Sequence, residues 1–278
     1  MKISVIGTPG CGRTVFLGLL YETLVRMSTA EGRGPEVVVN TGPAETKALG
    51  DLRLELLSGR WPSPDLRSKV SGCLLELGFS RSSRSIFRTR ELRKVGLENV
   101  PLAEKDVQVV RGSGQLREVL QGSPGGSIDR YGLSEGFREA LESEALVLLA
   151  DISPETSEGP WPGGERDAFL ATVADDASMT RLGKEREVDI LVVLTKGDRA
   201  EADEQNRFEE MYPRTARSLR KAIPGGEAGS NVFVSWIGAV PVEGGAPVPA
   251  AVVSEGQVQI DYSEKEYRRL VERIGRIA

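Results

Sequence analysis

The sequence predicts an α/β fold in which a doubly wound, mostly parallel sheet is covered by helices on both faces. Three apolar runs carry this prediction, at residues 2–6, 145–150 and 188–194, because each is typical of a buried parallel strand. Each run is followed by a helical pattern, and strands that alternate with helices favour a parallel sheet. Ligands of such sheets bind at the carboxyl ends of the strands, so the residues after each run are the first functional candidates.

The other elements follow from periodicity and from turn residues. Helices are expected over residues 13–29, 43–57, 133–143, 165–186, 202–222 with a break near Pro213, and 263–277 with Ser263 as its cap. Further strands are expected over residues 36–40, 70–79, 94–100, 231–234 and 257–261. Residues 60–64 should be extended or turned, because they include two prolines, which block a helix. We expect one domain over residues 1–278, with loop insertions at about 79–130 and 239–256; a short helix at 115–121 interrupts the first.

Composition excludes several classes of function. The net charge is −5, so no overall basic field would attract nucleic acid, and no apolar run approaches the length of a membrane span. The chain begins with a strand pattern instead of a signal peptide and has only Cys11 and Cys73, which favours a cytoplasmic location. It contains no histidine, which excludes catalysis by Ser-His-Asp or Cys-His groups.

A glycine-rich loop follows the first predicted strand. Gly7, Gly10 and Gly12 stand in the pattern Gly-x-x-x-x-Gly-Arg-Thr, directly before a predicted helix. A strand, such a loop and a helix together are the context of a phosphate-binding P-loop, as in the P-loop NTPase folds. The phosphates would contact Gly7, Gly10, Cys11, Gly12 and Arg13, and the Thr14 hydroxyl would bind Mg²⁺. Arg13 stands where lysine is usual, which keeps the positive charge but replaces a compact ammonium by a planar group.

Two further strand ends carry distinctive residues. Thr195-Lys196-Gly197-Asp198 resembles the base-reading motif of the GTPase superclass of P-loop proteins, in which a carboxylate pairs with guanine and the lysine stem covers the base. Ser235-Trp236 resembles the loop of these proteins that presents a backbone N–H to the guanine carbonyl. The resemblance implies GTP or GDP with Mg²⁺ as the ligands, bound by the phosphate loop, Thr195, Lys196, Asp198, Ser235 and Trp236.

A finer resemblance rests on residues 57–62, Leu-Ser-Gly-Arg-Trp-Pro, at the end of a predicted helix. This segment is similar to that of the bacterial double-GTPase group, which implies a role in a multi-component signalling or conflict system.

The switch motifs of the superclass are degenerate. Ser63 stands where the first switch would supply a threonine to Mg²⁺. The second switch, Asp-x-x-Gly, corresponds to Asn99-Val100-Pro101-Leu102, which lacks both the carboxylate and the glycine; Asp106 and Gly112 offer an alternative alignment. Asp151, at the end of a predicted strand, is interpreted as adjacent to the site instead of as a metal ligand.

These patterns predict a guanine-nucleotide-binding, GTPase-like domain with slow or partner-dependent hydrolysis, acting as a switch or assembly module with a protein partner. No catalytic residue can be assigned, so the chain is at most a weak Mg²⁺-dependent GTPase. One alternative is a pseudo-GTPase, an interaction scaffold that binds no nucleotide. Another is an ATP-dependent kinase or ATPase, in which Asp151 is the obvious carboxylate base.

Overall fold

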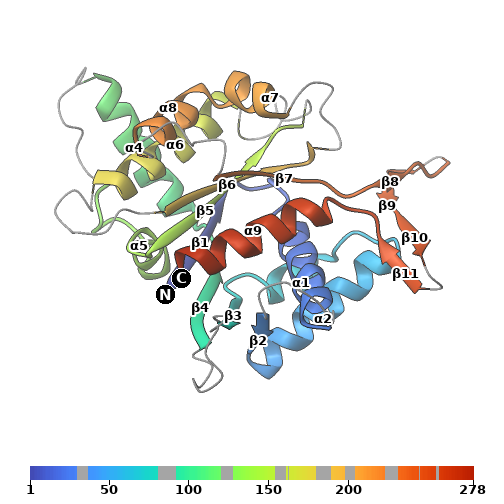
Figure 1. Ribbon diagram of the computed structural model, residues 1–278. Helices are drawn as coiled ribbons and strands as arrows, with labels where there is room; N and C mark the ends of the chain where they lie inside the picture. Colours follow the sequence, from blue (N-terminus) through green and yellow to red (C-terminus); the bar gives the residue numbers. More distant parts are fainter. Residues whose placement is uncertain are drawn as a thin grey trace. The chain divides into compact units, whose positions relative to one another are not determined.

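The computed structural model describes residues 1–29, 37–80, 92–119, 128–153, 161, 163–179, 189–197, 204–222, 231–243, 245–254 and 257–278 (Figure 1). The chain divides into two compact units. Unit 1 consists of residues 1–2, 12–99 and 235–278, and unit 2 consists of residues 3–11 and 100–234. Both units are made of separate stretches of the sequence, so no single position divides the chain, and one domain over residues 1–278 stays a prediction.

Unit 2 contains the predicted parallel strands. The strands β1 (Lys2–Gly7), β5 (Ala145–Asp151), β6 (Asp189–Thr195) and β7 (Val232–Ser235) lie in this order. β5 pairs in parallel with both β1 and β6. Every residue of β5 is buried, and its alternate residues Leu146 and Leu148 pack into a core with the helices of the unit. Val147 and Leu149, which face the other way, are also buried, so both faces of this strand are covered.

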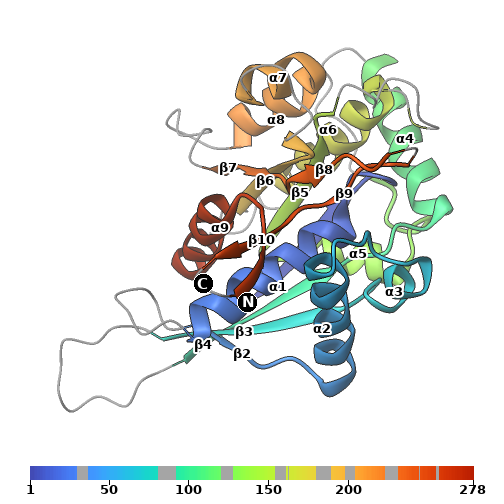
Figure 2. The same ribbon diagram turned by 90° about the vertical axis from the view of Figure 1, so that its right-hand side faces the viewer.

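The helices of unit 2 are α4 (Glu104–Val119), α5 (Glu135–Leu141), α6 (Gly163–Met179), α7 (Glu204–Met211) and α8 (Pro213–Ala222). α6 packs against both α4 and α8 (Figures 1 and 2). Ser134 caps α5, because its hydroxyl accepts a bond from Phe137 N. The predicted break near Pro213 is confirmed: Pro213 starts α8, and buried Asp167 of α6 accepts the N–H groups of Arg214 and Thr215.

Helix α4 is longer than the sequence indicates. A loop with a short helix at 115–121 is predicted there, but the helix runs from Glu104 to Val119. Gly112 and Gly114 weaken the local helical signal. Packing restores the helix, because a Cβ at Gly114 would lie only 2.8 Å from Thr172 Oγ1 of α6, and Val107 and Val110 enter the core.

Unit 1 has a different architecture. Its strands β2 (Val37–Val39), β3 (Leu74–Ser80) and β4 (Leu92–Asn99) are antiparallel, so the predicted mostly parallel arrangement is confirmed for β1, β5 and β6 and does not extend to these strands. The helices of the unit are α1 (Arg13–Thr29), α2 (Pro43–Leu57), α3 (Pro64–Lys69) and α9 (Glu264–Ile277). The segment predicted as a loop insertion at 239–256 contains β8 (Ala239–Val240), β9 (Val248–Pro249) and β10 (Ala251–Ser254), and β10 pairs with β11 (Gln257–Ile260).

Two local predictions for unit 1 are wrong. Residue 64 is helical instead of extended or turned, because a proline fits the first turn of a helix and Ser63 caps α3 through a bond from Leu66 N. Ser263 precedes α9 as predicted, but its hydroxyl makes no cap bond within that helix. It accepts the Trp236 N–H instead, at 3.0 Å.

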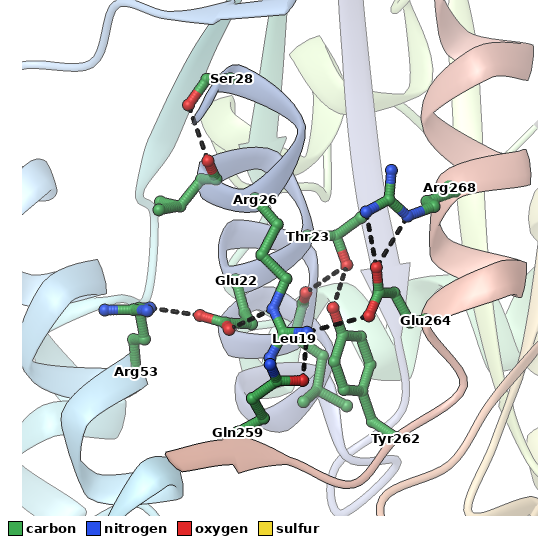
Figure 3. A network of polar contacts seen from close by, with 11 residues as sticks. Leu19, Glu22, Thr23, Arg26, Ser28, Arg53, Gln259, Tyr262, Glu264 and Arg268 are labelled. Atoms are coloured by element: carbon green, nitrogen blue, oxygen red, sulfur yellow. Dashed lines mark hydrogen bonds and ion pairs between the residues drawn. The ribbon is translucent and has the colours of Figure 1, made fainter. Parts of the chain in front are cut away.

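A polar network fastens α1 to its neighbours in unit 1 (Figure 3). Buried Glu22 accepts bonds from Arg26 of the same helix, at 2.6 Å, and from Arg53 of α2. Arg26 also donates to Gln259 of β11 and to Glu264 of α9, both at 3.0 Å. These bonds join α1 to three other elements of the unit. None of the described helices has both the length and the apolar character needed to cross a membrane.

Candidate functional site

The predicted phosphate loop has the backbone that its glycines allow. It leaves β1 at Gly7, turns through a bond from Cys11 N to Thr8 O at 3.2 Å, and enters α1 at Arg13. Gly10 and Gly12 have φ angles of 80° and 84°, which other residues rarely adopt. A Cβ at Gly7 would lie 2.5 Å from Cys11 Sγ, whereas a Cβ at Gly10 would meet no atom within 4 Å. The loop is therefore tightly closed at its base and open at Gly10.

The loop ends at the N-terminus of a helix of 17 residues. Phe16 N donates to Gly12 O at 2.9 Å, so the first helical turn closes on the last glycine of the motif. Arg13 and Thr14 are the first two residues of α1, and both are half-buried. No acidic residue lies in the first turn, so the positive end of the helix dipole is not neutralised there.

Thr8, inside the loop, has an unsatisfied polar group. Its side chain is buried, with 2% of its surface exposed, and its Oγ1 has no hydrogen-bond partner. A buried hydroxyl without a partner costs free energy, so such groups point to a missing ligand or water. Thr8 therefore supports the assignment of this loop as a phosphate site, and sequence reasoning missed it although the residue lies within the glycine motif.

Three neighbouring strands of unit 2 end at the same edge. Gly7 of β1 is in register with Leu149 of β5, and Asp151, two residues further on, is in register with Thr195 of β6. The carboxyl ends of these parallel strands bring the start of the loop, Asp151 and Thr195-Lys196 to one edge of the unit. This is where α/β sheets bind ligands.

Asp151 is the centre of a buried polar cluster at this edge. Its Oδ2 accepts a bond from Lys196 Nζ at 2.6 Å and a longer contact from Arg166 Nη1 at 3.4 Å. Its Oδ1 accepts the N–H and the hydroxyl of Ser153, at 3.0 and 2.8 Å. The Tyr212 hydroxyl donates to the Asp151 carbonyl at 3.0 Å, and burial followed by the nearby Asp151 charge raises the pKa of Tyr212 above its ordinary range. Sequence reasoning missed Arg166 and Tyr212, since no motif contains either.

Lys196 has an unusual backbone. Its φ is 59°, and among the described residues it is the one non-glycine residue with a positive φ. Thr195 is buried, and its hydroxyl donates to the Ala150 carbonyl at 3.3 Å. Asp198, the predicted guanine-reading carboxylate, lies outside the described residues.

Ser235 and Trp236 belong to unit 1, where both make contacts with the start of α9. The Ser235 hydroxyl is bonded to the Tyr267 hydroxyl at 2.6 Å. The Trp236 N–H, which belongs to the loop predicted to present a backbone N–H to a guanine carbonyl, is donated to Ser263 Oγ. A base could therefore accept this N–H only after Ser263 releases it.

The predicted switch residues have structural partners. The Ser63 hydroxyl caps α3, and its N–H donates to Glu55 Oε2 at 2.9 Å. Asn99 ends β4, and its amide donates to Val70 O at 2.7 Å, a bond that an ionised aspartate could not make. Leu102 is half-buried and packs against the core of unit 2.

Asp106, the alternative second-switch residue, is fully buried in unit 2. Its carboxylate accepts bonds from Ala103 N and from the N–H and hydroxyl of Ser134, at 3.2, 2.6 and 2.7 Å. This carboxylate therefore already joins the start of α4 to the cap of α5. Within the described part of the chain, no group of three or more Cys, Asp or Glu side chains is placed to hold a metal ion.

The segment that resembles the double-GTPase group closes α2. Gly59 has a φ of 68°, and Arg60 N donates back to Glu55 O at 2.9 Å, which ends the helix. Trp61 Nε1 donates to Pro247 O at 2.7 Å, next to β9. The segment thus connects α2 to the C-terminal part of unit 1.

Comparisons with known proteins complete the description. No protein-family model matches the sequence, and no curated protein matches it significantly. A crystal structure of the GTP-bound GTPase-like domain of Ski7 from S. cerevisiae is similar over 84% of this chain and 41% of that chain, with 12% identity and a TM-score of 0.41. A GTP-bound signal recognition particle receptor complex, SRb with SRX, from Chaetomium thermophilum is similar over 84% of this chain and 87% of that chain, with 17% identity and a TM-score of 0.36.

The chain therefore spans about two fifths of the length of the Ski7 chain. Both TM-scores are below 0.5, so neither similarity assigns a function to this chain.

Proposed function

We propose that this chain is a guanine-nucleotide-binding, GTPase-like domain that hydrolyses GTP slowly by itself and serves as a switch or assembly module. The observation that carries the proposal is the loop from Gly7 to Arg13. It combines positive φ angles at Gly10 and Gly12, the N-terminus of α1, and the unpartnered hydroxyl of buried Thr8. These features fit phosphate oxygens, which accept bonds from N–H and O–H groups.

Different residues would bind the phosphates, the metal ion and the base. Backbone N–H groups of the loop and the Arg13 guanidinium would hold the phosphates, and the Thr14 hydroxyl would bind Mg²⁺, which neutralises phosphate charge when bound. Lys196 and Asp198 would hold the base and select guanine. Lys196 supports this role, since it follows β6 at the edge of unit 2 where β1 enters the loop.

Slow hydrolysis follows from the switch residues. Asn99 has no carboxylate, and its Nδ2 donates to Val70 O, while its Oδ1 has no partner. The Asp106 carboxylate is bonded to Ser134, so neither residue supplies a free carboxylate to a metal-bound water. A useful rate would then need a protein partner that contributes an arginine or positions the attacking water.

Isothermal titration with GTP, GDP and ATP in Mg²⁺ tests the binding proposal. We expect micromolar or tighter GTP and GDP binding that Asp198→Ala abolishes and that Thr8→Val weakens about tenfold, because Thr8 loses a bond to phosphate. Thr8→Val should not lower the melting temperature without nucleotide, since it removes an unsatisfied group. Glu209→Ala, on the exposed surface of α7, is the matched control. Equal affinity for ATP and GTP would reject the choice of guanine.

A single-turnover assay tests the hydrolysis proposal. We expect a half-time of hours with most bound GTP recoverable intact, and a rate of about one per second without a partner would reject it.

A nucleotide-free scaffold is the second candidate function. Two observations favour it: Lys196 is paired with Asp151, and the Trp236 N–H is donated to Ser263. A thermal-shift series separates the candidates, because a ligand at 100 times its dissociation constant stabilises a protein by about 2.7 kcal/mol. No shift with millimolar GTP, GDP or ATP and Mg²⁺ would favour the scaffold.

A further inference from the structure

We propose that one face of the antiparallel strands in unit 1 is the contact through which two copies of this chain form a two-fold dimer. We call it the outer face, and it lies opposite the side on which α1 and α9 pack. The proposal goes beyond the proposed function, because it does not depend on nucleotide binding. The residues that define the outer face belong to unit 1 and are Val38 of β2, Leu74, Glu76 and Gly78 of β3, and Leu92, Lys94 and Gly96 of β4.

The opposite face of the same strands is buried. Leu77 and Val95, which alternate with the residues of the outer face, are each 1% exposed. Figure 2 shows α1 and α9 on one side of β3, and a Cβ at Gly275 of α9 would lie 2.7 Å from the ring of Phe79 in β3. The strands therefore already have a core on one side, and the outer face is not needed to complete that core.

The outer face is partly apolar, and the described part of the chain leaves it open to solvent. Val38, Leu74 and Leu92 keep 40%, 40% and 48% of their surface exposed. Single exposed apolar residues are ordinary in proteins, whereas these three share one face of three neighbouring strands. Such a grouping is typical of a surface that binds another protein.

A hollow lies in this face where β3 and β4 carry glycines. Its volume is about 210 Å³, and its lining includes Val38, Glu76, Gly78, Leu92, Lys94 and Gly96. A Cβ at Gly78 would lie 3.5 Å from Leu92 and 3.7 Å from Val38, so the absence of a side chain there leaves room between two apolar groups. The hollow is several times the volume of about 30 Å³ that one water occupies, so it can accept a side chain of a partner. The same face thus has both a hollow and exposed leucines to fill a second hollow like it.

Two charges of opposite sign identify the partner as a second copy. Glu76 and Lys94 are diagonal neighbours, because Glu76 is in register with Gly96 and Lys94 with Gly78. Among the residues that the structure describes, neither of these side chains has an ion-pair partner. In a two-fold contact, Glu76 of each copy can meet Lys94 of the other, so the face is complementary to itself. A partner of a single sign, such as a nucleic acid, would leave one of the two charges opposed to a like charge.

Sedimentation equilibrium of the wild-type chain without nucleotide is the first test. One of the three strands has only three residues, so the contact is small and we expect a weak dimer with a dissociation constant of about 10–100 µM. A mass of one chain at every concentration up to about 1 mM would overturn the proposal, since a different occupant would then have to cover the face.

Charge reversal tests whether the dimer uses this face. In Lys94→Glu, carboxylates of the two copies would face each other, so we expect dimerisation to weaken about a hundredfold. Glu76→Lys should have the same effect by bringing amines together. An equal mixture of the two variants should form a heterodimer, because opposite charges then meet at both positions. Lys47→Glu is the matched control, since Lys47 is an exposed lysine on α2 of the same unit, and it should dimerise as the wild type does.

Gly78→Ala tests the hollow. The added methyl group would make only ordinary contacts inside the chain, so the melting temperature of the monomer should not fall, while dimerisation should weaken about tenfold. Dimerisation that the charge reversals leave unchanged, or a mixture of the two variants that stays monomeric, would overturn the assignment to this face. Melting temperatures near that of the wild type show that the variants fold, as expected for exposed side chains. Titration with GDP gives a separate result, so failure of nucleotide binding and failure of the dimer are distinguishable.

Discussion

Glu22 in unit 1 and Asp151 in unit 2 are both buried carboxylates held by two cations, but their surroundings differ. The cations around Glu22 continue into further acceptors: Arg26 reaches Gln259 and Glu264 as well (Figure 3). Around Asp151, the Lys196 side chain keeps 32% of its surface exposed, and the buried Nε of Arg166 has no partner. A closed network fastens structural elements, whereas an open cluster leaves polar groups available at the edge where ligands bind.

The largest expected effect is on the closed network. Glu22→Gln leaves Arg26 and Arg53 without their shared charge, so we expect a loss of about 3–5 kcal/mol in the free energy of unfolding. Urea denaturation measures this loss, and the GTP-to-ATP affinity ratio should not change. A loss below about 1 kcal/mol would show that Glu22 does not organise unit 1.

The next prediction concerns Asn99. Like Asp151 it ends a strand, but its amide donates to a backbone carbonyl, that of Val70. Asn99→Asp places a carboxylate oxygen against the Val70 carbonyl, which should cost about 1–3 kcal/mol in stability. It should not increase GTP turnover, although it restores the aspartate of a second switch. Faster turnover in the single-turnover assay would mean that Asn99 faces the metal in the active state.

A smaller effect is expected at Tyr262, which belongs to the network around α1. Burial raises the pKa of this tyrosine to about 12, and its hydroxyl is bonded to Thr23 Oγ1 at 2.9 Å. An unfolded tyrosine ionises near pH 10, so the unfolded state loses its proton first and stability falls as the pH rises from about 10 to 12.

Tyr262→Phe should therefore cost about 1 kcal/mol at pH 7 and progressively less above pH 10. Denaturation at a series of pH values measures both curves, and parallel curves would exclude this ionisation as a contributor. Tyr212 and Tyr267 remain in the variant, and since burial raises both pKa values, some alkaline loss should persist.

The smallest expected effect is at Ser63. Its hydroxyl accepts the Leu66 N–H, whereas the Thr8 hydroxyl has no hydrogen-bond partner. Ser63→Ala removes the cap of α3 and should cost about 0.5–1 kcal/mol without nucleotide. If Ser63 only caps the helix, its loss leaves the Mg²⁺ dependence of GTP binding unchanged. A Mg²⁺ dependence that shifts in titrations would instead support the predicted metal contact.

The parts of the fold that sequence reasoning predicted are those with strong local signals. The run 145–150 is apolar throughout and forms β5, and Pro43 and Gly59 delimit α2 within one or two residues. The phosphate loop could be predicted because the spacing of its glycines indicates the backbone geometry directly. The partner of Lys196 could not be predicted from the sequence, because Asp151 is distant along the chain and only the register of β5 and β6 brings the two residues together.

The predicted switch residues show what could not be predicted from the sequence. Asn99 and Asp106 are judged from sequence as degraded or alternative metal ligands, but their bonds to Val70 and Ser134 are tertiary contacts that no spacing reveals. Ser263 is a similar case, because a serine before a helix usually caps it, whereas here it accepts the Trp236 N–H.

The glycines of α4 also affect when this helix can fold during synthesis. This helix depends on its contact with α6, since Gly112 and Gly114 weaken it by itself and Gly114 fits closely against Thr172. The ribosome completes α6 about 60 residues after α4, which takes about 3–12 s at ordinary rates of translation. During that interval the nascent chain holds the residues of α4 without the surface on which they fold.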